Sequence, residues 1–453
     1  MTSADRAFAW MTWALPVVLL TAYGAWMLAV WPGVLGPDSY AILKEVSKSE
    51  GQFSAGKTVV WHHFLKALYG TTQRVEIPVI FQLGFAIAIQ SRILLQCWRW
   101  ELKKTFYFLL VFITLAPHTI LHMGMLYPDG MFALAVTAVL FELWITLRSG
   151  KINITSLIIL IVATPFALYG RTNGVVMLLP LAYATYRLTG PERLKLISIV
   201  IIWCTLIFTA SKFHKQLQVS QLFSLTIYET VNFMQPRPMK LWTERPRLSH
   251  KTLDTLHRYA STEELRQAYD RDYWDPLVLH PDGPQLGRMS KQDSRIIQRE
   301  FIRYNLWQNL PAFFSSRVNI FLVSAMAQGG IVTTGGYGTE YLLKQLDTRS
   351  IYRPFDFPLL TSAVLTLSAW SFTLRLILWT PFIGIGLISL LLFSAGARRD
   401  YNMIFLLSPM IIQLGGIFLF STAGEYRYIL PFFFISLFAM PALALARLGG
   451  RTP

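Results

Sequence analysis

Charged side chains recur where long apolar segments of this sequence end. The first stands in "WPGVLGPDSYAILKEV", which runs from Trp31 to Val46 directly after an apolar run. Its Asp38 precedes a helical pattern, and an Asp at that place can cap the helix by accepting backbone N–H groups. A partly desolvated carboxylate at the border of water and hydrocarbon can also serve as a general base. Both roles are open for Asp38.

Three further short segments carry a charge at the same kind of border. Asp129 lies in "LYPDGM", Arg171 in "YGRTNGV" and Arg427 in "GEYRY". Pro-Asp-Gly is typical of a turn, but Asp129 is also a candidate to orient an acceptor, to bind a metal or to act as a second catalytic acid. An Arg at a span end can simply extend its charge to the interface, or it can grip a phosphate with its planar fork.

Cations outnumber acids in these segments. Lys57 and His62 lie in the long loop after the first apolar run, and His62 belongs to the amphipathic stretch "WHHFLKAL". His118 and His122 are four residues apart, so on a helix they share one face. Without a third ligand nearby, that pair indicates a polar seam or a phosphate-facing pair rather than zinc. This excess of cations is expected around a phosphate leaving group.

Other familiar motifs give no competing site. "DRD" at 270–272 spells a metal-binding Asp-x-Asp, but it falls in a charged helical pattern and is expected to be a solvated face. The sequence contains no Gly-rich phosphate loop, no HExxH and no Gly-x-Ser-x-Gly elbow.

The composition places all of these residues in a membrane protein. Of the 453 residues, 53% are hydrophobic and 15% are charged, whereas about a quarter are charged in soluble domains. The formal net charge of +16 is explained largely by basic residues at inner helix ends, so no nucleic-acid partner is expected. No cleavable signal peptide is expected, and Cys97 and Cys204 suggest neither a disulfide framework nor a thiolate metal site.

The spans that must position the charges follow from the apolar runs. We expect them at 9–31, 77–97, 105–125, 131–147, 154–169, 174–187, 195–213, 375–395, 401–422 and 429–446. Basic clusters fall at every second connection, which places both termini in the cytoplasm and the charged segments above on the outer side.

The chain therefore divides into three predicted regions. Residues 1–213 form a transmembrane module of seven spans with a long first outer loop at 32–76, and residues 375–453 form C-terminal spans. Between them, 214–374 is predicted to be a mainly helical outer region. Within it, 311–328 and 358–373 are either extra spans or interfacial helices, so the total is ten to twelve spans.

The order of these motifs resembles the GT-C superfamily of integral-membrane glycosyltransferases. The resemblance rests on the acid in a long first outer loop with amphipathic helices, the short acidic second loop "YPDG", the Arg in "GRTNG" and the closing "GEYRYILP". It covers residues 1–213 in topology, and the size and undivided layout are similar to the Gtr-type transferases that decorate O-antigen or other surface glycans.

The resemblance implies a specific chemistry and location. The donor would be a polyprenyl-phosphate monosaccharide (undecaprenyl phosphate in bacteria), the acceptor a periplasmic glycan or lipid, and the enzyme a multi-pass protein of the bacterial inner membrane. Asp38 matches the catalytic base of the family, with Asp129 as a second catalytic candidate. Tyr40, Tyr127 and Glu425 are expected to orient acceptor or sugar. No cofactor is certain, although a divalent metal is possible.

Two other functional classes stay open at this stage. A transporter or flippase of lipid-linked sugars would carry functional polar groups near the middle of the bilayer and often a repeat. A membrane O-acyltransferase would carry a catalytic His in or near the membrane, for which His118 is a candidate.

Overall fold

The structure is a computed structural model that describes residues 3–47, 52–53, 58–212, 215–216, 221–236, 247–328, 336–353 and 355–448. The chain divides into two compact units. Unit 1 comprises Met1–Leu217, Val332–Gln413 and Arg427–Pro453, and unit 2 comprises Gln218–Ile331 and Leu414–Tyr426. Each unit is described by itself.

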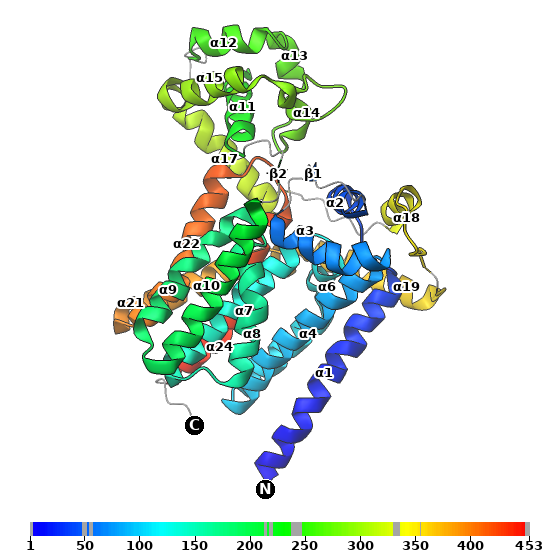
Figure 1. The fold of residues 1–453 in the computed structure, drawn as a ribbon, viewed down its shortest axis with the longest axis vertical. Coiled ribbons are helices and arrows are strands. Elements are labelled where there is room, and N and C mark those ends of the chain that lie inside the picture. The colour runs from blue at the N-terminus through cyan, green and yellow to red at the C-terminus, as the bar shows by residue number, and fades with distance from the viewer. Residues whose placement is uncertain are drawn as a thin grey trace. The chain divides into compact units, whose positions relative to one another are not determined.

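Helices long and apolar enough to cross a membrane dominate the chain. In the described ranges there are seven: Phe8–Ala29, Glu76–Arg99, Pro128–Ser149, Gly190–Lys212, Arg375–Arg398, Tyr401–Phe420 and Tyr426–Arg447. They coincide with seven of the ten predicted spans, and Figure 1 shows α4, α7, α8, α9 and α10 running alongside one another. The protein is therefore an all-α, polytopic membrane protein, as the sequence predicted.

Unit 1 is organised around α7 (Pro128–Ser149). This helix is buried along almost its whole length and contacts α4 (Glu76–Arg99), α8 (Ile154–Tyr169) and the C-terminal helices α23 (Leu430–Phe434) and α24 (Ser436–Arg447). A helix that is apolar on every side belongs in the centre of a bundle. α7 thus forms the core on which the neighbouring helices pack.

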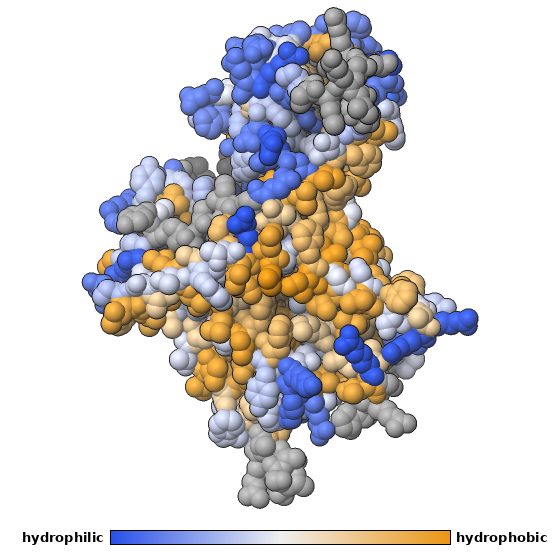
Figure 2. Space-filling model, turned by 180° about the vertical axis from the view of Figure 1, so that it is seen from behind, coloured by the Kyte–Doolittle hydropathy of each residue, from blue (hydrophilic) through white to orange (hydrophobic). Residues whose placement is uncertain are grey.

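The helices at the periphery of unit 1 instead expose large apolar side chains. On α10 (Gly190–Lys212), Ile201, Ile202, Leu206 and Phe208 are all more than half exposed. In Figure 2, apolar side chains cover much of the visible face of the bundle, and hydrophilic ones gather at its lower end. Exposed apolar area on this scale is typical of a surface that faces lipid.

The other three predicted spans are not among these seven helices. The span predicted at 105–125 is divided into α5 (Lys103–Leu115) and α6 (Pro117–Gly124), because Pro117 has no N–H for a helical hydrogen bond. The span at 154–169 matches α8, which has only 16 residues. The span at 174–187 is built from the 3₁₀ helix η2 (Thr172–Met177) and α9 (Leu178–Arg187).

The first outer loop folds into short helices, as its two amphipathic stretches predicted. They are α2 (Pro37–Ser47), α3 (Val59–Leu65) and the π-helical turn η1 (Lys66–Gly70). Strand β1 (Gln52–Phe53) pairs in parallel with β2 (Lys215–Gln216), a contact that the sequence did not indicate.

The remaining helices of unit 1 are α1, at the start of the chain, and the elements that come after Ile331. α1 is Ser3–Ala29; the others are α18 (Gly336–Gln345), α19 (Pro358–Thr373), α20 (Arg375–Leu378), α21 (Phe382–Arg398) and the 3₁₀ turn η6 (Tyr426–Ile429). α22 (Tyr401–Phe420) contributes residues to both units.

Unit 2 is helical around a small apolar core. Its elements are α11 (Gln221–Met234), α12 (His250–His257), α13 (Thr262–Gln267), α14 (Asp275–Val278), η4 (Leu286–Arg288), α15 (Lys291–Glu300), η5 (Phe301–Asn305), α16 (Leu306–Gln308) and α17 (Leu310–Ser324). Ile227, Leu256 and Ile297 bring α11, α12 and α15 into one core cluster. The helical pattern predicted at 261–274 forms a helix only at α13, where Ser261 and Glu264 make a capping box, whereas the pattern predicted at 291–307 is helical from the start of α15.

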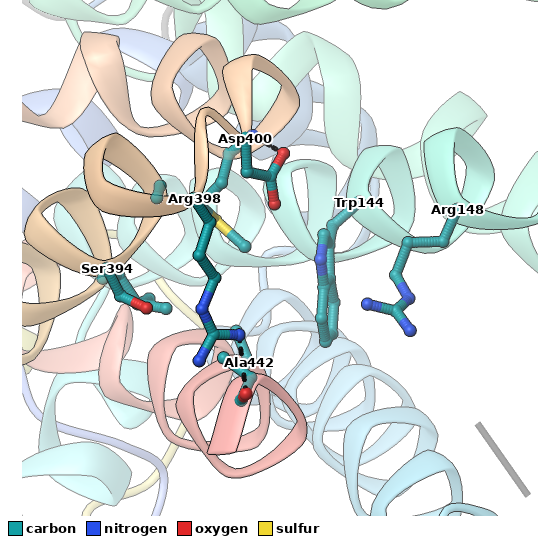
Figure 3. Close-up of a pocket in the computed structure, with 10 residues that line it drawn as sticks. Trp144, Arg148, Ser394, Arg398, Asp400 and Ala442 are labelled. Atoms are coloured by element: carbon teal, nitrogen blue, oxygen red, sulfur yellow. Dashed lines mark hydrogen bonds between the residues drawn. The ribbon is translucent and has the colours of Figure 1, made fainter. Parts of the chain in front are cut away.

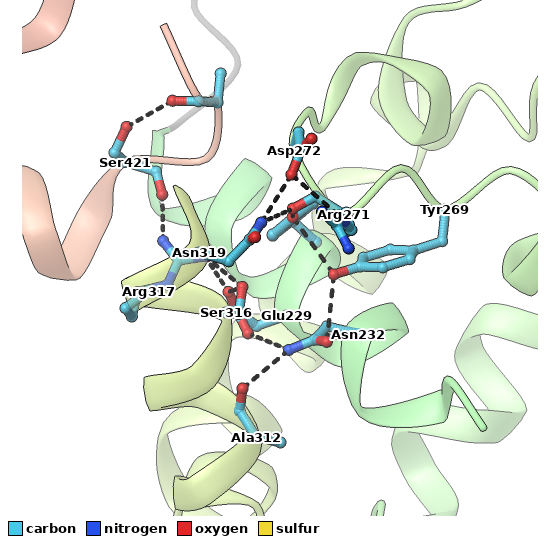
Figure 4. Close-up of polar contacts among 12 residues, drawn as sticks. Glu229, Asn232, Tyr269, Arg271, Asp272, Ala312, Ser316, Arg317, Asn319 and Ser421 are labelled. Carbon is cyan, nitrogen blue, oxygen red and sulfur yellow. Dashed lines mark hydrogen bonds and ion pairs between the residues drawn. The ribbon is translucent and has the colours of Figure 1, made fainter. Parts of the chain in front are cut away.

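A buried polar network joins α11 to α17 within unit 2 (Figure 4). Arg317 and Glu229 are both fully buried and form an ion pair, and Ser316 donates to Glu229 Oε1 at 2.8 Å. Arg317 also donates to the backbone carbonyl of Ser421. This network gives α17, one of the two possible extra spans, a fixed partner inside unit 2. With 15 and 16 residues, α17 and α19 are both shorter than the helices counted above.

The "DRD" segment is not the helical face that the sequence predicted. Residues 270–272 form a bend after α13, in which Asp270 Oδ1 accepts from the backbone N–H of Asp272 at 2.8 Å. Asn319 donates to Asp272 Oδ1 at 2.7 Å, and the N–H of Gly424 donates to the Asp272 carbonyl at 2.8 Å. Asp favours such local side-chain bonds over a helix, and here they anchor the segment that follows α22.

Candidate functional site

The start of the loop after α1 is fixed against the segment before α7. Val34 pairs with Met125 in a parallel bridge, and its N–H donates to the carbonyl of Gly124 at 3.1 Å. Gly33 makes this approach possible, since its φ is +130° and an added Cβ would lie 2.9 Å from Val79. The beginning of α2 is thereby held beside the start of α7, although the two are far apart in the chain.

A second close contact involves Gly36 and Tyr127. A Cβ on Gly36 would lie 1.9 Å from the hydroxyl oxygen of Tyr127, so only glycine leaves room for this phenol. Ser39 adds a bond between the loops, because its hydroxyl donates to the carbonyl of Leu126 at 3.3 Å. Tyr127, predicted to orient acceptor or sugar, therefore packs against Gly36, the residue directly before Pro37 and Asp38.

Asp38 faces Arg427. Arg427 Nη1 donates to Asp38 Oδ2 at 2.5 Å, and the two side chains are 17% and 34% exposed. Asp38 is the second residue of α2 rather than the residue before it, so it does not hold the N-cap position that the sequence left open. Its negative charge still lies at the positive end of the helix.

Arg427 is also enclosed by aromatic rings. Its guanidinium carbon lies 4.9 Å from the centre of the Tyr127 ring and 5.4 Å from that of Tyr428. A guanidinium over a phenol ring gains cation–π attraction. His122, half-buried in the last turn of α6, is close enough to Arg427 for their charges to interact.

A second acid–arginine pair lies on the other side of Tyr428. Arg171 forms an ion pair with Asp129, whose side chain is only 1% exposed. The guanidinium carbon of Arg171 lies 4.8 Å from the centre of the Tyr428 ring. The Pro-Asp-Gly segment is the first turn of α7 rather than an isolated turn, and Gly130 allows α7 to pack against the carbonyl of His122, which would be 2.3 Å from a Cβ.

These contacts form one continuous array, which we call the outer cluster: Asp38, Arg427, Tyr428, Arg171 and Asp129, with Tyr127 beside Arg427. Two carboxylates balance two guanidiniums, and Tyr428 contacts both cations. The four charged residues that the sequence singled out are therefore neighbours. Tyr428 was missed, although the aromatic residues flanking Arg427 in "EYRY" were a signal for it.

The other predicted site residues have different surroundings or lie outside the described residues. Lys57 is outside the described residues, and so is the side chain of His118, whose backbone lies in α6. His62 is 3% exposed on α3. Tyr40 accepts a hydrogen bond from Lys44 at 3.3 Å, and Glu425 is half-buried in unit 2.

Metal ligands do not gather among these residues. In the ranges that the structure describes, no group of three His, Cys, Asp or Glu side chains is arranged to hold a metal ion. The carboxylates of Asp38 and Asp129 instead face guanidiniums.

A different ion pair lies inside the bundle, at two residues that the sequence analysis did not predict to be part of a site. Arg92 of α4 donates through Nε and Nη2 to the two carboxylate oxygens of Glu142 on α7, at 2.9 and 3.3 Å. Ser156 of α8 donates to Glu142 Oε2 at 2.6 Å, and Gln96 accepts from Arg92 at 3.0 Å. Ionisable groups within a span are often functional, but here the partners satisfy one another and join three helices.

Comparison with known proteins adds no relative. No protein-family model, no curated protein and no solved structure matches the chain.

Proposed function

We propose that this chain is an inverting membrane glycosyltransferase of the GT-C type, which moves a sugar from a polyprenyl-phosphate monosaccharide to a periplasmic glycan or lipid. The observation that carries the proposal is the outer cluster. Four charged residues from separate segments, each chosen for its type and span-end position, lie within one array of ion pairs and cation–π contacts. The site lies at the ends of apolar helices, where the phosphate of a lipid-borne donor would be.

Asp38 is the general base in this proposal. It is the more exposed of the two acids, at 34% against 1% for Asp129, so only Asp38 can reach an acceptor hydroxyl. The carboxylate takes the hydroxyl proton while the acceptor oxygen forms a bond to the anomeric carbon. The bond from that carbon to the phosphate oxygen breaks on the opposite face, and its electron pair leaves with the lipid phosphate. The anomeric configuration is inverted.

Arg427 and Arg171 are the groups that stabilise the leaving phosphate. A guanidinium fork can bind phosphate oxygens in a bidentate manner, and preorganised cations aimed at developing negative charge supply a large part of catalysis. Asp129 is then a positioning residue that holds Arg171. Tyr428, which contacts both arginines, sets the spacing between them.

The Asp38–Arg427 pair gives the site an order of events. A carboxylate that faces a guanidinium accepts a proton less readily than one whose cation has turned to another anion. A bound donor phosphate competes for Arg427 and so releases Asp38 for its role as base. Donor binding therefore precedes activation of the base.

The test is transfer by purified protein in nanodiscs, supplied with a panel of polyprenyl-phosphate monosaccharides and a glycolipid extract as acceptor. We expect sugar transfer with release of polyprenyl phosphate from one donor class. Arg171→Lys and Arg427→Lys should each raise the donor KM, because a point charge replaces a bidentate fork. An absence of polyprenyl-phosphate binding by the folded protein would refute the proposal.

The two alternative functions, a transporter and a membrane O-acyltransferase, have less support among the described residues. For a transporter, the relevant feature is the Arg92–Glu142 pair, whose carboxylate is 1% exposed and already bonded to three donor groups. For an O-acyltransferase, the catalytic His would be His118, whose side chain is outside the described residues.

A further inference from the structure

A pocket at the opposite end of α7 from Asp129 has a chemistry that the proposed function does not use. It has a volume of about 150 Å³ and lies among the last turns of α7, α21 and α24 and the start of α22. Its polar side chains are Arg148, Ser394, Arg398 and Asp400, and the ring of Trp144 lies between Arg148 and the other three (Figure 3). A single water needs on the order of 10–15 Å³, so the pocket can hold a group of several heavy atoms.

The positions of Arg148 and Arg398 at this pocket are explained in part by the helix ends. Both stand in the last turn of a helix, where a cation is favoured by the helix dipole. Arg398 Nη1 donates to the carbonyl of Ala446 at 2.6 Å, while Arg148 lies 5.6 Å from the centre of the Trp144 ring. Arg398 has five N–H donors, and the described residues engage one of them, which leaves most of its fork for a ligand.

Asp400 adds the opposite charge to the same pocket. Its Oδ1 accepts from the N–H of Met403 at 3.2 Å and so caps α22. Its Oδ2 has no hydrogen bond from the part of the chain that the structure describes. A purely anionic ligand would meet this carboxylate unfavourably, whereas a ligand that carries both a phosphate and an ammonium would satisfy all three charges.

Apolar residues continue from the pocket along α21. Phe393, next to the lining residue Ser394, is 79% exposed, and Leu390 is 55% exposed one turn earlier. Both belong to a helix apolar enough to cross a membrane. A ligand that extends from a zwitterionic head into an apolar tail would therefore cover both parts of this surface.

We propose that this pocket binds the headgroup of a phospholipid whose phosphodiester is joined to a primary amine, such as phosphatidylethanolamine. Arg398 binds the phosphate, Arg148 adds positive charge from the other side of the Trp144 ring, Asp400 accepts from the ammonium, and an acyl chain lies over Leu390 and Phe393. By the predicted topology, this lipid belongs to the inner leaflet. The proposal is independent of the glycosyltransferase assignment.

Native mass spectrometry of the full chain tests the assignment, with titrations of phosphatidylethanolamine, phosphatidylcholine and phosphatidylglycerol of identical acyl chains. The wild type should retain phosphatidylethanolamine best, because a quaternary choline cannot donate to Asp400 and phosphatidylglycerol carries no ammonium. Asp400→Asn should lose this preference by roughly two- to five-fold, the range for exposed ion pairs. Asn caps α22 as well as Asp does, so the fold is retained.

The arginines are tested in the same experiment. Arg148→Gln combined with Arg398→Gln should weaken phosphatidylethanolamine and phosphatidylcholine alike, because both lipids share the phosphate. Arg399→Gln is the matched control, an exposed neighbour that does not line the pocket. Equal retention of the three lipids by the wild type would overturn the proposal. So would an Asp400→Asn variant that behaves like the control, or displacement of the lipid by soluble phosphoethanolamine at equal concentration.

Discussion

Replacement of Asp38 by Asn separates a catalytic carboxylate from one that merely holds Arg427. Asn keeps the size of the side chain and can still accept a hydrogen bond, but it cannot take up a proton. Because Asp38 lies in the first turn of α2 rather than at its N-cap position, loss of a cap does not complicate the comparison. What changes is the ion pair to Arg427, 2.5 Å away, and the capacity to act as a base.

The two roles differ in magnitude. Asp38 is 34% exposed, so solvent screens the pair and its loss should cost at most about 1 kcal/mol of stability. Loss of a general base costs 10²–10⁴-fold in rate, or roughly 3–5 kcal/mol in the barrier. The double variant Asp38→Asn with Arg427→Gln removes both charges, so its melting curve shows how much of any damage comes from an unpaired guanidinium. Its transfer rate should stay low in any case, because Arg427 is also proposed to stabilise the leaving phosphate.

The assay is sugar transfer from a polyprenyl-phosphate donor by folded variants, with a melting curve for each. We expect Asp38→Asn and the double variant to lose at least 100-fold in transfer rate while their melting curves stay close to that of the wild type. Glu45→Gln, on α2 two turns from Asp38, is the matched control and should transfer normally. Near-normal transfer by Asp38→Asn, or recovery in the double variant, would refute the assignment of Asp38 as the base.

Four further predictions address the surroundings of the site and the fold. Tyr428→Leu should raise the donor KM by roughly ten-fold through loss of two cation–π contacts, whereas Tyr428→Phe keeps the ring and should not; equal KM values for the two would exclude a positioning role. Glu142→Ala should lower the free energy of unfolding in detergent by about 3 kcal/mol and Arg92→Met with Glu142→Leu should recover much of it, an expectation that fails if the double variant is the less stable. The Tyr259 hydroxyl, which bonds Asp293, holds the pKa of that carboxyl below its usual range. The stability this adds is therefore present above about pH 4 and lost as the pH falls through the folded-state pKa; the amide protection factors of α15, corrected for the intrinsic exchange rate at each pH, should fall below about pH 4, and less so in Asp293→Asn. Asp282→Cys, at a side chain 92% exposed, should react with an impermeant thiol reagent in intact spheroplasts, and labelling only after lysis would reverse the predicted topology.

Most of the helices were predictable because each depends on local sequence. Apolar runs such as 131–147 are long enough to need a bilayer or a bundle centre around them, and α7 forms there with small changes at its ends. The third span was wrongly predicted to be undivided, although Pro117, which cannot donate a helical hydrogen bond, was a signal for its division. By contrast, local residue types could not predict the parallel pairing of β1 with β2, which joins segments more than 150 residues apart in the chain.

The residue types of the outer cluster were legible in the sequence, whereas its pairing was decided by the tertiary structure. Asp38, Asp129, Arg171 and Arg427 stood out because charge at a span end needs a reason. Which acid meets which arginine depends on contacts between helices that are distant in sequence, so spacing along the chain carries no information about it. The same holds for Tyr428, which contacts both arginines only because α7 and η2 begin beside η6.

The buried charges show most clearly what the sequence could not predict, namely which charged residues pair with each other. Arg92 and Glu142 each look like an isolated charge in an apolar run, and their role depends on whether a partner lies on another helix. Glu229 and Arg317 pair in the same way within unit 2. Charge and hydropathy determined that this chain lies in a membrane. Packing decided whether each buried charge destabilises the fold or links two helices. A charge is tolerated away from water only where a partner and hydrogen bonds compensate it.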